Sequence, residues 1–230
     1  MKYAVFSDIH GNLPALQAVL RDAEGNGCEG YLCAGDIVGE YGQPEECVEM
    51  VRSIGALCVK GNQDEYCGTE MTLDGFNENA RERIRGAREA LSEESKEWLN
   101  KLPLVLDGDG FTLVHATLDH PERWGYVFDK FAAAASFAGQ KSAVCFNGHT
   151  HVPVCFERDQ VVRGGTYTQV SFLHGSKYLV NVGSVGQPRD GIAKSSYVIY
   201  DEDNKTATLK RIDFMMPGGG PAAAPVIQPR

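Results

Sequence analysis

Short apolar runs alternate with amphipathic stretches in the first part of the chain. The run from Tyr3 to Ser7 contains β-branched and aromatic residues, and the following stretch, Leu13 to Ala23, has apolar residues at helical spacing. The same pattern recurs in Gly30 to Ala34 followed by Pro44 to Ile54, and a further apolar run spans Ala56 to Val59. Strands that alternate with helices favour a parallel, doubly wound α/β arrangement for this half of the chain.

The pattern changes after the first third of the chain. Residues 77–101 are rich in Glu, Arg, Ala and Leu, which predicts one or two helices in a lid-like segment. Further on, short apolar runs separated by Gly, Asp and Pro predict a strand-rich second half, with one helix across Lys130 to Gly139. These runs are 104–106, 111–115, 143–147, 152–157, 169–173, 179–181 and 196–200. We therefore expect one domain over residues 1–214, followed by a flexible tail of Pro, Gly and Ala over residues 215–230.

Composition narrows the class of protein. The chain of 230 residues is 43% hydrophobic, which is enough for a sizeable core, and its formal net charge is −9. An acidic chain argues against binding to nucleic-acid duplexes or to anionic membranes, because both require a basic surface. The seven cysteines include no C-x-x-C pair, and the amino-terminal apolar stretch is too short for a signal peptide or a membrane span. These features predict a cytoplasmic protein with reduced thiols, and they leave a homo-oligomer open.

Seven polar side chains follow the ends of predicted strands. In a parallel sheet these ends lie along one edge, where ligands bind, so residues that are distant in sequence can converge there. The side chains are those of Asp8, His10, Asp36, Asn62, His115, His149 and His151. They offer nitrogen and oxygen ligands of the kind that transition metals such as Mn, Fe, Zn or Ni accept.

The number of these ligands exceeds what one such ion usually takes. Two ions roughly 3.5–4 Å apart that share one carboxylate would use all of them and would clamp a phosphoryl group during in-line displacement. Asp36 is the natural bridge because a carboxylate has two oxygens to donate.

Each motif has a simpler explanation when it is taken alone. An Asp-x-His sequence can cap a loop, a Gly-Asp pair before a helix is typical of a turn or an N-cap, and His115 can be a satisfied, half-buried histidine. Taken together, these explanations must place four of only six histidines at strand ends by accident. The joint pattern therefore favours a metal site.

The ordered motifs resemble the five-part signature of the calcineurin-like metallophosphoesterases, which runs D-x-H, G-D-x-x, G-N-H-[DE], a lone His and G-H-x-H. The matching segments here are Asp8 to His10, Gly35 to Val38, Gly61 to Asp64, His115, and Gly148 to His151. The later stretch from Asn181 to Asp190 is similar to the smaller bacterial branch of that family. The resemblance covers about residues 1–200.

This resemblance implies both a fold and a chemistry. The fold would be a four-layer α/β/β/α sandwich of two mixed sheets, with the site on loops at one sheet edge. Two divalent transition-metal ions, with manganese favoured, would act on a small phosphorylated or nucleotide-like substrate. The phosphodiester or nucleotide-type phosphate bond would be hydrolysed by a metal-bridging hydroxide. One ion would be held by Asp8, His10, Asp36 and His151, and the other by Asp36, Asn62, His115 and His149. The catalytic residues implied are Asn62, Gln63, Asp64 and His115.

One position departs from the family pattern. The residue after the metal-binding asparagine is commonly a histidine, held by the following acid, that contacts the phosphate and can protonate the leaving group. Here it is Gln63, followed by Asp64. A glutamine amide donates a hydrogen bond but cannot give up a proton, and general acid catalysis is typically worth 10²–10⁴-fold.

Three explanations for this departure stay open. The leaving group of the substrate can need little help, as in aryl or nucleotide-like esters. The proton can come from Asp64, His120 or a metal-bound water. Alternatively, the protein is a catalytically weak metal-binding scaffold or regulatory module. A phosphomonoesterase or protein phosphatase is a further alternative, which is weakened because Gln63 cannot protonate a serine alkoxide.

Two further features each allow two interpretations. Arg189, in the sequence G-Q-P-R-D-G, can pair with its neighbour Asp190 or can clamp a substrate phosphate with its forked guanidinium. Residues 118–128 are predicted to form an edge strand with one face in the core. If this segment overhangs the metals instead, its alternating aromatic side chains could stack on a nucleobase.

Overall fold

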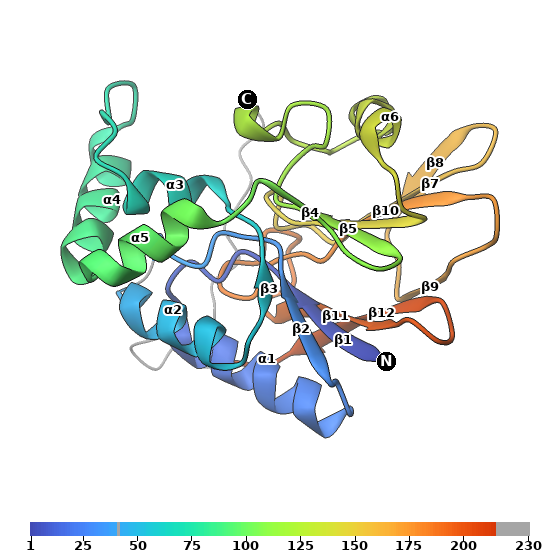
Figure 1. The fold of residues 1–230 in the computed structure, drawn as a ribbon, viewed down its shortest axis with the longest axis horizontal. Coiled ribbons are helices and arrows are strands. Elements are labelled where there is room, and N and C mark those ends of the chain that lie inside the picture. Colours follow the sequence, from blue (N-terminus) through green and yellow to red (C-terminus); the bar gives the residue numbers. More distant parts are fainter. Residues whose placement is uncertain (41, 215–230) are drawn as a thin grey trace.

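The computed structural model describes residues 1–40 and 42–214, so the tail predicted for residues 215–230 lies outside the described residues. Two six-stranded sheets lie face to face, and helices cover their outer faces (Figure 1). Each sheet contains both parallel and antiparallel pairs. The four-layer α/β/β/α sandwich implied by the resemblance is therefore confirmed.

The first sheet has the strand order β3-β2-β1-β11-β12-β9. Its strands are β1 (Lys2–Phe6), β2 (Gly30–Cys33), β3 (Leu57–Cys58), β9 (Gln169–Ser171), β11 (Ser195–Asp201) and β12 (Thr206–Ile212). The three strands from the first half of the chain are parallel, as predicted, whereas β11, β12 and β9 are joined in antiparallel pairs. The C-terminal strands thus complete the sheet that the N-terminal strands begin.

The second sheet has the order β4-β5-β6-β10-β7-β8. Its strands are β4 (Val105–Asp107), β5 (Phe111–Val114), β6 (Val144–Asn147), β7 (Cys155–Arg158), β8 (Val162–Gly165) and β10 (Lys177–Asn181). The central strands β5, β6 and β10 are parallel, and the outer strands pair in antiparallel fashion. The strand-rich second half predicted from the sequence is therefore confirmed.

Three buried apolar clusters fill the three spaces between the four layers. Phe6 of β1 packs in the cluster under α1 (Leu13–Gly25) and α2 (Pro44–Ser53), while its neighbour Val5 points between the sheets. The third cluster lies between the second sheet and α6 (Lys130–Gly139). Successive side chains of a strand face opposite sides, so β1 serves two interfaces at once. The doubly wound prediction is wrong in this respect, because the inner face of the first sheet is covered by a second sheet instead of helices.

Three further helices gather at one end of the sandwich (Figure 1). They are α3 (Asn62–Gly68), α4 (Glu78–Ala90) and α5 (Glu93–Lys101). The helical prediction for residues 77–101 is confirmed as two helices, whose first N–H groups are capped by the side chains of Asn77 and Ser92. The guanidinium of Arg88 donates to the carbonyls of Tyr66 and Met71, which ties α4 to the end of α3.

The predicted edge strand over residues 118–128 is wrong. A short 3-10 helix, η1 (Pro121–Arg123), occupies its centre, and the next residue, Trp124, has a left-handed backbone with φ of 53°. The proline lacks an N–H and the left-handed residue turns the chain, so neither fits an extended strand. The structure also adds α3, β8 and β12, which the sequence patterns did not predict.

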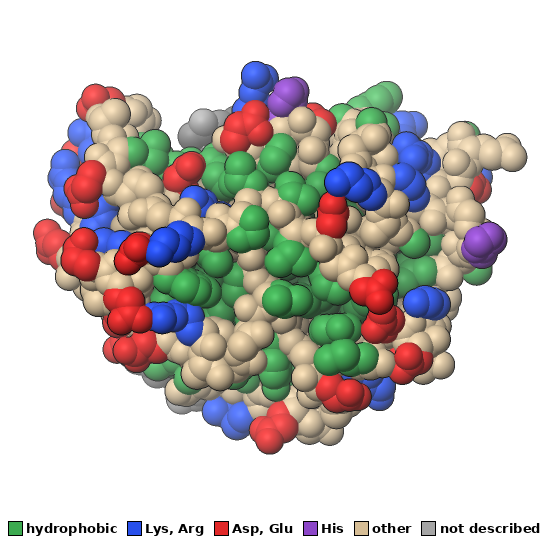
Figure 2. Space-filling model, viewed as in Figure 1, with side chains coloured by type: hydrophobic (Ala, Val, Ile, Leu, Met, Phe, Trp, Pro, Cys, Tyr) green, Lys and Arg blue, Asp and Glu red, His purple; other side chains and the backbone are tan. Residues whose placement is uncertain are grey.

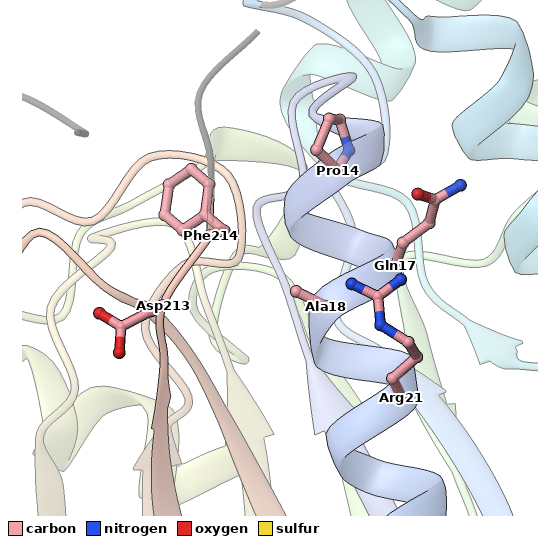
Figure 3. Close-up of a pocket in the computed structure, with 6 residues that line it drawn as sticks. All are labelled: Pro14, Gln17, Ala18, Arg21, Asp213 and Phe214. Atoms are coloured by element: carbon pink, nitrogen blue, oxygen red, sulfur yellow. The ribbon is translucent and has the colours of Figure 1, made fainter. Parts of the chain in front are cut away.

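The surface carries interspersed charges and a groove beside α1. On the face in Figure 2, lysines and arginines are interspersed with acidic side chains, and apolar side chains gather near the centre. A groove of about 300 Å³ between α1 and the end of β12 is lined by Pro14, Gln17, Ala18, Arg21, Asp213 and Phe214 (Figure 3). It contains none of the predicted metal ligands.

In the part of the chain that the structure describes, no helix combines the length and apolar character needed to span a membrane.

Candidate metal centre

The candidate site forms where loops leave the carboxyl ends of parallel strands in both sheets. The N–H of Asp8 donates to the carbonyl of Gly35 (3.0 Å), which joins the loops after β1 and β2. In the other sheet, the N–H of Gly148 donates to the carbonyl of His115 (3.0 Å), which joins the loops after β5 and β6. These bonds hold short segments from distant parts of the sequence in one place.

One cluster consists of Asp8, His10 and His151. The Nε2 atoms of the two histidines lie 3.1 Å apart, and His151 Nε2 lies 3.2 Å from Asp8 Oδ1. The His10 Nε2 atom is 3.8 Å from the same carboxylate oxygen. All three side chains are buried.

A second cluster consists of Asp36, His115 and His149, with Asn62 beside it. The Nε2 atom of His115 lies 3.1 Å from His149 Nδ1, 3.2 Å from Asn62 Oδ1 and 3.5 Å from Asp36 Oδ2. The same Asp36 oxygen is 3.7 Å from His10 Nε2 in the first cluster. All seven predicted metal ligands thus come together, with the Asp36 carboxylate between the two clusters.

Backbone carbonyls fix the orientation of three of the four histidines. In each case the ring nitrogen that faces away from the cluster lies within hydrogen-bond distance of a carbonyl oxygen. The pairs are His115 Nδ1 with Ala34 (2.7 Å), His149 Nε2 with Trp124 (2.9 Å) and His151 Nδ1 with Gln187 (2.6 Å). A carbonyl only accepts, so each of these nitrogens carries the hydrogen. The opposite nitrogen of a neutral ring then presents its lone pair to the cluster, which is how a metal-binding histidine is usually oriented.

This arrangement fits a pair of divalent ions. In the first cluster the Nε2 atoms of two buried histidines face each other, and Asp8 Oδ1 and His10 Nδ1 are buried without a hydrogen-bond partner among the described residues. A buried carboxylate oxygen without a partner is unfavourable, and a cation in the cluster would supply one. Imidazole nitrogens with carboxylate and amide oxygens form a donor set that suits first-row transition metals.

The electrostatics of the histidines agree with this interpretation. Burial lowers the pKa of His10 to about 3 and the pKa of His149 to about 4, so both rings are neutral near neutral pH. His115 differs: burial, the largest single effect, lowers its pKa, but Asp36, Asp8 and the hydrogen bond to Ala34 together raise the pKa of His115 to about 9. Without a metal, a proton on His115 therefore compensates the negative charge that a cation would otherwise neutralise.

The backbone is strained at the same residues. In the described part of the chain, seven non-glycine residues have a positive φ, and five of them are predicted metal ligands. These are Asp8 (55°), His10 (54°), Asp36 (54°), His149 (66°) and His151 (59°). The left-handed conformation costs roughly 1–2 kcal/mol for a residue with a Cβ, and such strain gathers at ligand clamps.

Asp64 has a different place from the one the family pattern implies. Its Oδ2 atom accepts from the N–H groups of Asp36 and Gly61 (both 2.9 Å), and its Oδ1 atom accepts from Ile37 (2.8 Å) and Val38 (3.2 Å). The side chain is fully buried. Asp64 therefore ties the loop after β2 to the start of α3, instead of holding the side chain at position 63 or facing a substrate.

The other residues considered as proton donors or substrate contacts also find their places. His120 is a surface residue, 3.5 Å from Glu122 and with 56% of its side chain exposed. Gln63 uses its backbone N–H to bind Asp36 Oδ1 (2.8 Å), which helps to orient the shared carboxylate.

Arg189 does not pair with its neighbour. Asp190 forms an ion pair with Arg211, and the guanidinium of Arg189 donates to Gln187 Oε1 (2.8 Å). The backbone N–H of Arg189 donates to the carbonyl of His151 (3.3 Å), so the residue lies beside the first cluster. The structure thus removes the simpler of the two interpretations of Arg189.

A strap after β10 completes the first cluster. The N–H of Gly186 and the hydroxyl of Ser184 both donate to the carbonyl of Asp8 (3.0 and 2.8 Å), and the carbonyl of Gln187 binds His151. The stretch from Asn181 to Asp190, which the sequence singled out by resemblance, therefore wraps the loops that carry two ligands. Sequence reasoning missed the contribution of Ala34, Trp124 and Gln187, because they act through backbone carbonyls.

Comparison with known proteins identifies a family model and relatives that match most of the chain. Residues 1–205 match the family model described as the calcineurin-like phosphoesterase superfamily domain. The chain is 38% identical over 217 residues to the protein named "Uncharacterized protein MJ0912" of Methanocaldococcus jannaschii, covering 92% of this chain and 87% of that protein.

Two solved structures show the same architecture. A metallophosphoesterase from Sphaerobacter thermophilus is 34% identical, with a TM-score of 0.81 and coverage of 93% of this chain and 89% of that one. The hypothetical protein PH1004 from Pyrococcus horikoshii OT3 is 19% identical, with a TM-score of 0.74 and coverage of 93% and 88%. The second likeness concerns the fold alone.

Proposed function

The chain belongs to the calcineurin-like phosphoesterase superfamily, and from this premise we propose that it is a binuclear metal-dependent hydrolase of phosphodiester or nucleotide-type phosphate bonds. The observation that carries the proposal is the pair of buried clusters that meet at Asp36, whose Oδ2 atom is 3.7 Å from His10 Nε2 and 3.5 Å from His115 Nε2. A single carboxylate between two sets of ligands is what a shared, two-ion site requires.

The proposal assigns the ligands as the geometry groups them. The first ion would be held by Asp8, His10, Asp36 and His151, and the second by Asp36, Asn62, His115 and His149. Two bound divalent ions would supply an activated water near neutral pH and neutralise charge that develops on the phosphate oxygens. Manganese is the ion we favour. The seven cysteines are all free, which supports a reducing, cytoplasmic location as part of the proposal.

The residues around the clusters define which substrates fit. Arg189, whose backbone N–H donates to the carbonyl of His151, would bind a phosphate oxygen through its guanidinium and set its orientation. Gln63 can donate a hydrogen bond from its amide but no proton. Since Asp64 is fully engaged with backbone N–H groups and His120 pairs with Glu122 on the surface, neither replaces the missing acid. A leaving group that departs without protonation, as in aryl or nucleotide-type esters, is therefore favoured.

The direct test compares a diester with a monoester. We would measure hydrolysis of bis-(p-nitrophenyl) phosphate and p-nitrophenyl phosphate by protein stripped of metal and reloaded with Mn²⁺, for the wild type and Gln63→His. We expect the wild type to cleave the diester well, and the histidine variant to gain mainly on the monoester, by up to about 10²-fold. If neither substrate is cleaved with any metal until histidine is introduced, the alternative of a metal-binding scaffold or regulatory module takes its place.

The role of Arg189 is tested separately. In Arg189→Ala we expect KM for the diester to rise about tenfold, because a charge-assisted contact to the phosphate is lost. Arg163→Ala is the matched control. Arg163 lies on β8 and forms an exposed ion pair with Asp159, which precedes that strand. An unchanged KM in Arg189→Ala would remove the clamp while leaving the metal centre in place.

A further inference from the structure

Aromatic rings form a continuous stack that starts at a predicted metal ligand and ends in solvent. The ring of Tyr126 lies on the imidazole of His149, with centroids 4.2 Å apart and planes at 22°. Phe128 in turn lies nearly parallel to Tyr126, at 5.3 Å and 8°. Tyr126 is 50% exposed and Phe128 is 64% exposed, so apolar ring surface is open beside the second cluster.

The chain holds this stack in place by contacts on both sides of it. The carbonyl of Trp124 binds His149 Nε2 (2.9 Å), and the indole of Trp124 donates to Glu65 of α3 (3.3 Å). Val127, between the two exposed aromatic residues, is 2% exposed and packs in the cluster under α6. The extended alternation that suggested an edge strand instead turns Val127 inward and its two neighbours outward.

Exposure of these two rings to water is unfavourable. Both stay half or more exposed and parallel on a segment that is fixed at Trp124 and Val127. Planar rings held open in this way are suited to stacking, because every nucleobase and aryl group presents a similar π-face.

We propose that the stack formed by Tyr126 and Phe128, named the aromatic wall, binds the planar aromatic group of the substrate while its phosphate lies at the two clusters. The inference rests on the proposed function and deepens it by naming the substrate class, a phosphate joined to a nucleobase. Phe128 offers the outer face of the wall, two rings away from the cluster. A substrate that reaches it carries its base on a sugar or a longer phosphate chain.

Binding of two non-hydrolysable compounds tests the wall without relying on turnover. Adenosine 5′-(α,β-methylene)diphosphate and methylenediphosphonate share the same phosphonate group, and only the first carries a nucleoside. Calorimetric titration of the Mn²⁺-loaded wild type should show about tenfold tighter binding of the nucleoside compound, which is within the range measured for one stacked base. Phe128→Ala should remove most of this preference, since it deletes the outer ring of the wall and leaves Tyr126 on His149.

Phe131→Ala is the matched control. Phe131, the second residue of α6, is close in sequence and 75% exposed, but its ring contacts Lys130 and takes no part in the stack of Tyr126 and Phe128. This variant should keep the preference for the nucleoside compound. Equal affinity of the wild type for the two compounds, no binding of either, or the same loss in Phe131→Ala and Phe128→Ala would overturn the proposal.

Activity on bis-(p-nitrophenyl) phosphate, measured on the same wild-type preparation, separates the two proposals. A preference for the nucleoside compound without any hydrolysis would support the aromatic wall and contradict the proposed function. Hydrolysis with equal binding of the two compounds would contradict the wall alone.

Discussion

At some positions of the candidate site, side chains lie so close to the backbone that only glycine fits there. At Gly148, just before the two histidines that follow β6, a Cβ atom would lie 2.1 Å from Ser7 Oγ and 2.4 Å from Asp8 Oδ2. Glycine is required there because these side chains already fill the space. The glycine of the G-H-x-H motif thus allows ligands from the two sheets to meet.

Gly148→Ala is expected to destabilise the fold and displace Asp8. We expect a loss of about 1–3 kcal/mol in the free energy of unfolding, as for overpacking of a filled core, together with weaker metal binding. Urea unfolding and metal analysis would measure both. Gly165→Ala is the control, since a Cβ there meets nothing within 4 Å and the change should be within about 0.5 kcal/mol. Equal stability of the two variants would show that the space at Gly148 is not filled.

The convergence of the predicted ligands could be expected from the sequence for a simple reason. Each polar side chain follows an apolar run, and the parallel strands bring their carboxyl ends together, so position along the chain implies position in space. The carbonyls of Ala34, Trp124 and Gln187 that orient three histidines could not be predicted in this way. Every residue carries a carbonyl, and only the folded chain shows which ones face a ring.

At the scale of helices and loops, the start of α3 connects two loops of the candidate site through the side chain of Asp64. Asp64 is the third residue of α3 and accepts a hydrogen bond from Gly61, its N-cap, as an acidic residue in the first turn often does. The same carboxylate also accepts three N–H groups from the loop after β2, including that of Asp36. One buried side chain therefore sets the distance between the loops that carry Asp36 and Asn62.

Asp64→Asn should loosen this connection. An amide keeps one acceptor oxygen and places an NH2 group against two N–H donors, and each buried N–H without an acceptor costs about 1–3 kcal/mol. We expect the free energy of unfolding to fall by about 3 kcal/mol and metal affinity to fall with it. Asp74→Asn, at an exposed position in the loop before α4, should change neither. Full metal binding in Asp64→Asn would contradict the role assigned to Asp64.

Elements were predictable where packing and periodicity agree. The helices α1 and α2 each bury one apolar face, and their sequences show it at helical spacing. The strand β12, with the sequence T-A-T-L-K-R-I, is only partly buried and carries polar residues that hide its pattern. In residues 118–128 the alternation is real, but Pro121 and the left-handed Trp124 prevent strand pairing, and the exposed rings face outward. An alternating pattern in the sequence therefore does not by itself distinguish a strand such as β12 from an irregular segment such as residues 118–128.

The sandwich as a complete body brings the two sheets together over one site. The ligands come from loops after β1, β2, β5 and β6, and from the start of α3, so neither sheet holds a full set alone. Strain at five predicted ligands, and an Asp8 carboxylate oxygen buried without a hydrogen-bond partner among the described residues, make this part of the protein unfavourable without a cation. Metal binding should therefore add to global stability as well as to chemistry, because the unfolded chain does not preserve the site.

Removal of metal is expected to lower the melting temperature of the protein. An ion present at 100-fold its Kd adds about 2.7 kcal/mol, which corresponds to roughly 5–10 °C for a chain of this size. Protein loaded with Mn²⁺ should bind two ions, melt higher than chelated protein, and regain the difference on reloading. Asp36→Asn should fold, and its melting temperature in chelator should stay near that of the chelated wild type. It should nevertheless bind fewer than two ions and gain less stability from Mn²⁺. Asp159→Asn, which alters an exposed ion pair, should behave as the wild type. Two ions and a full thermal shift in Asp36→Asn would contradict a shared carboxylate, since each cluster would then hold its ion without it.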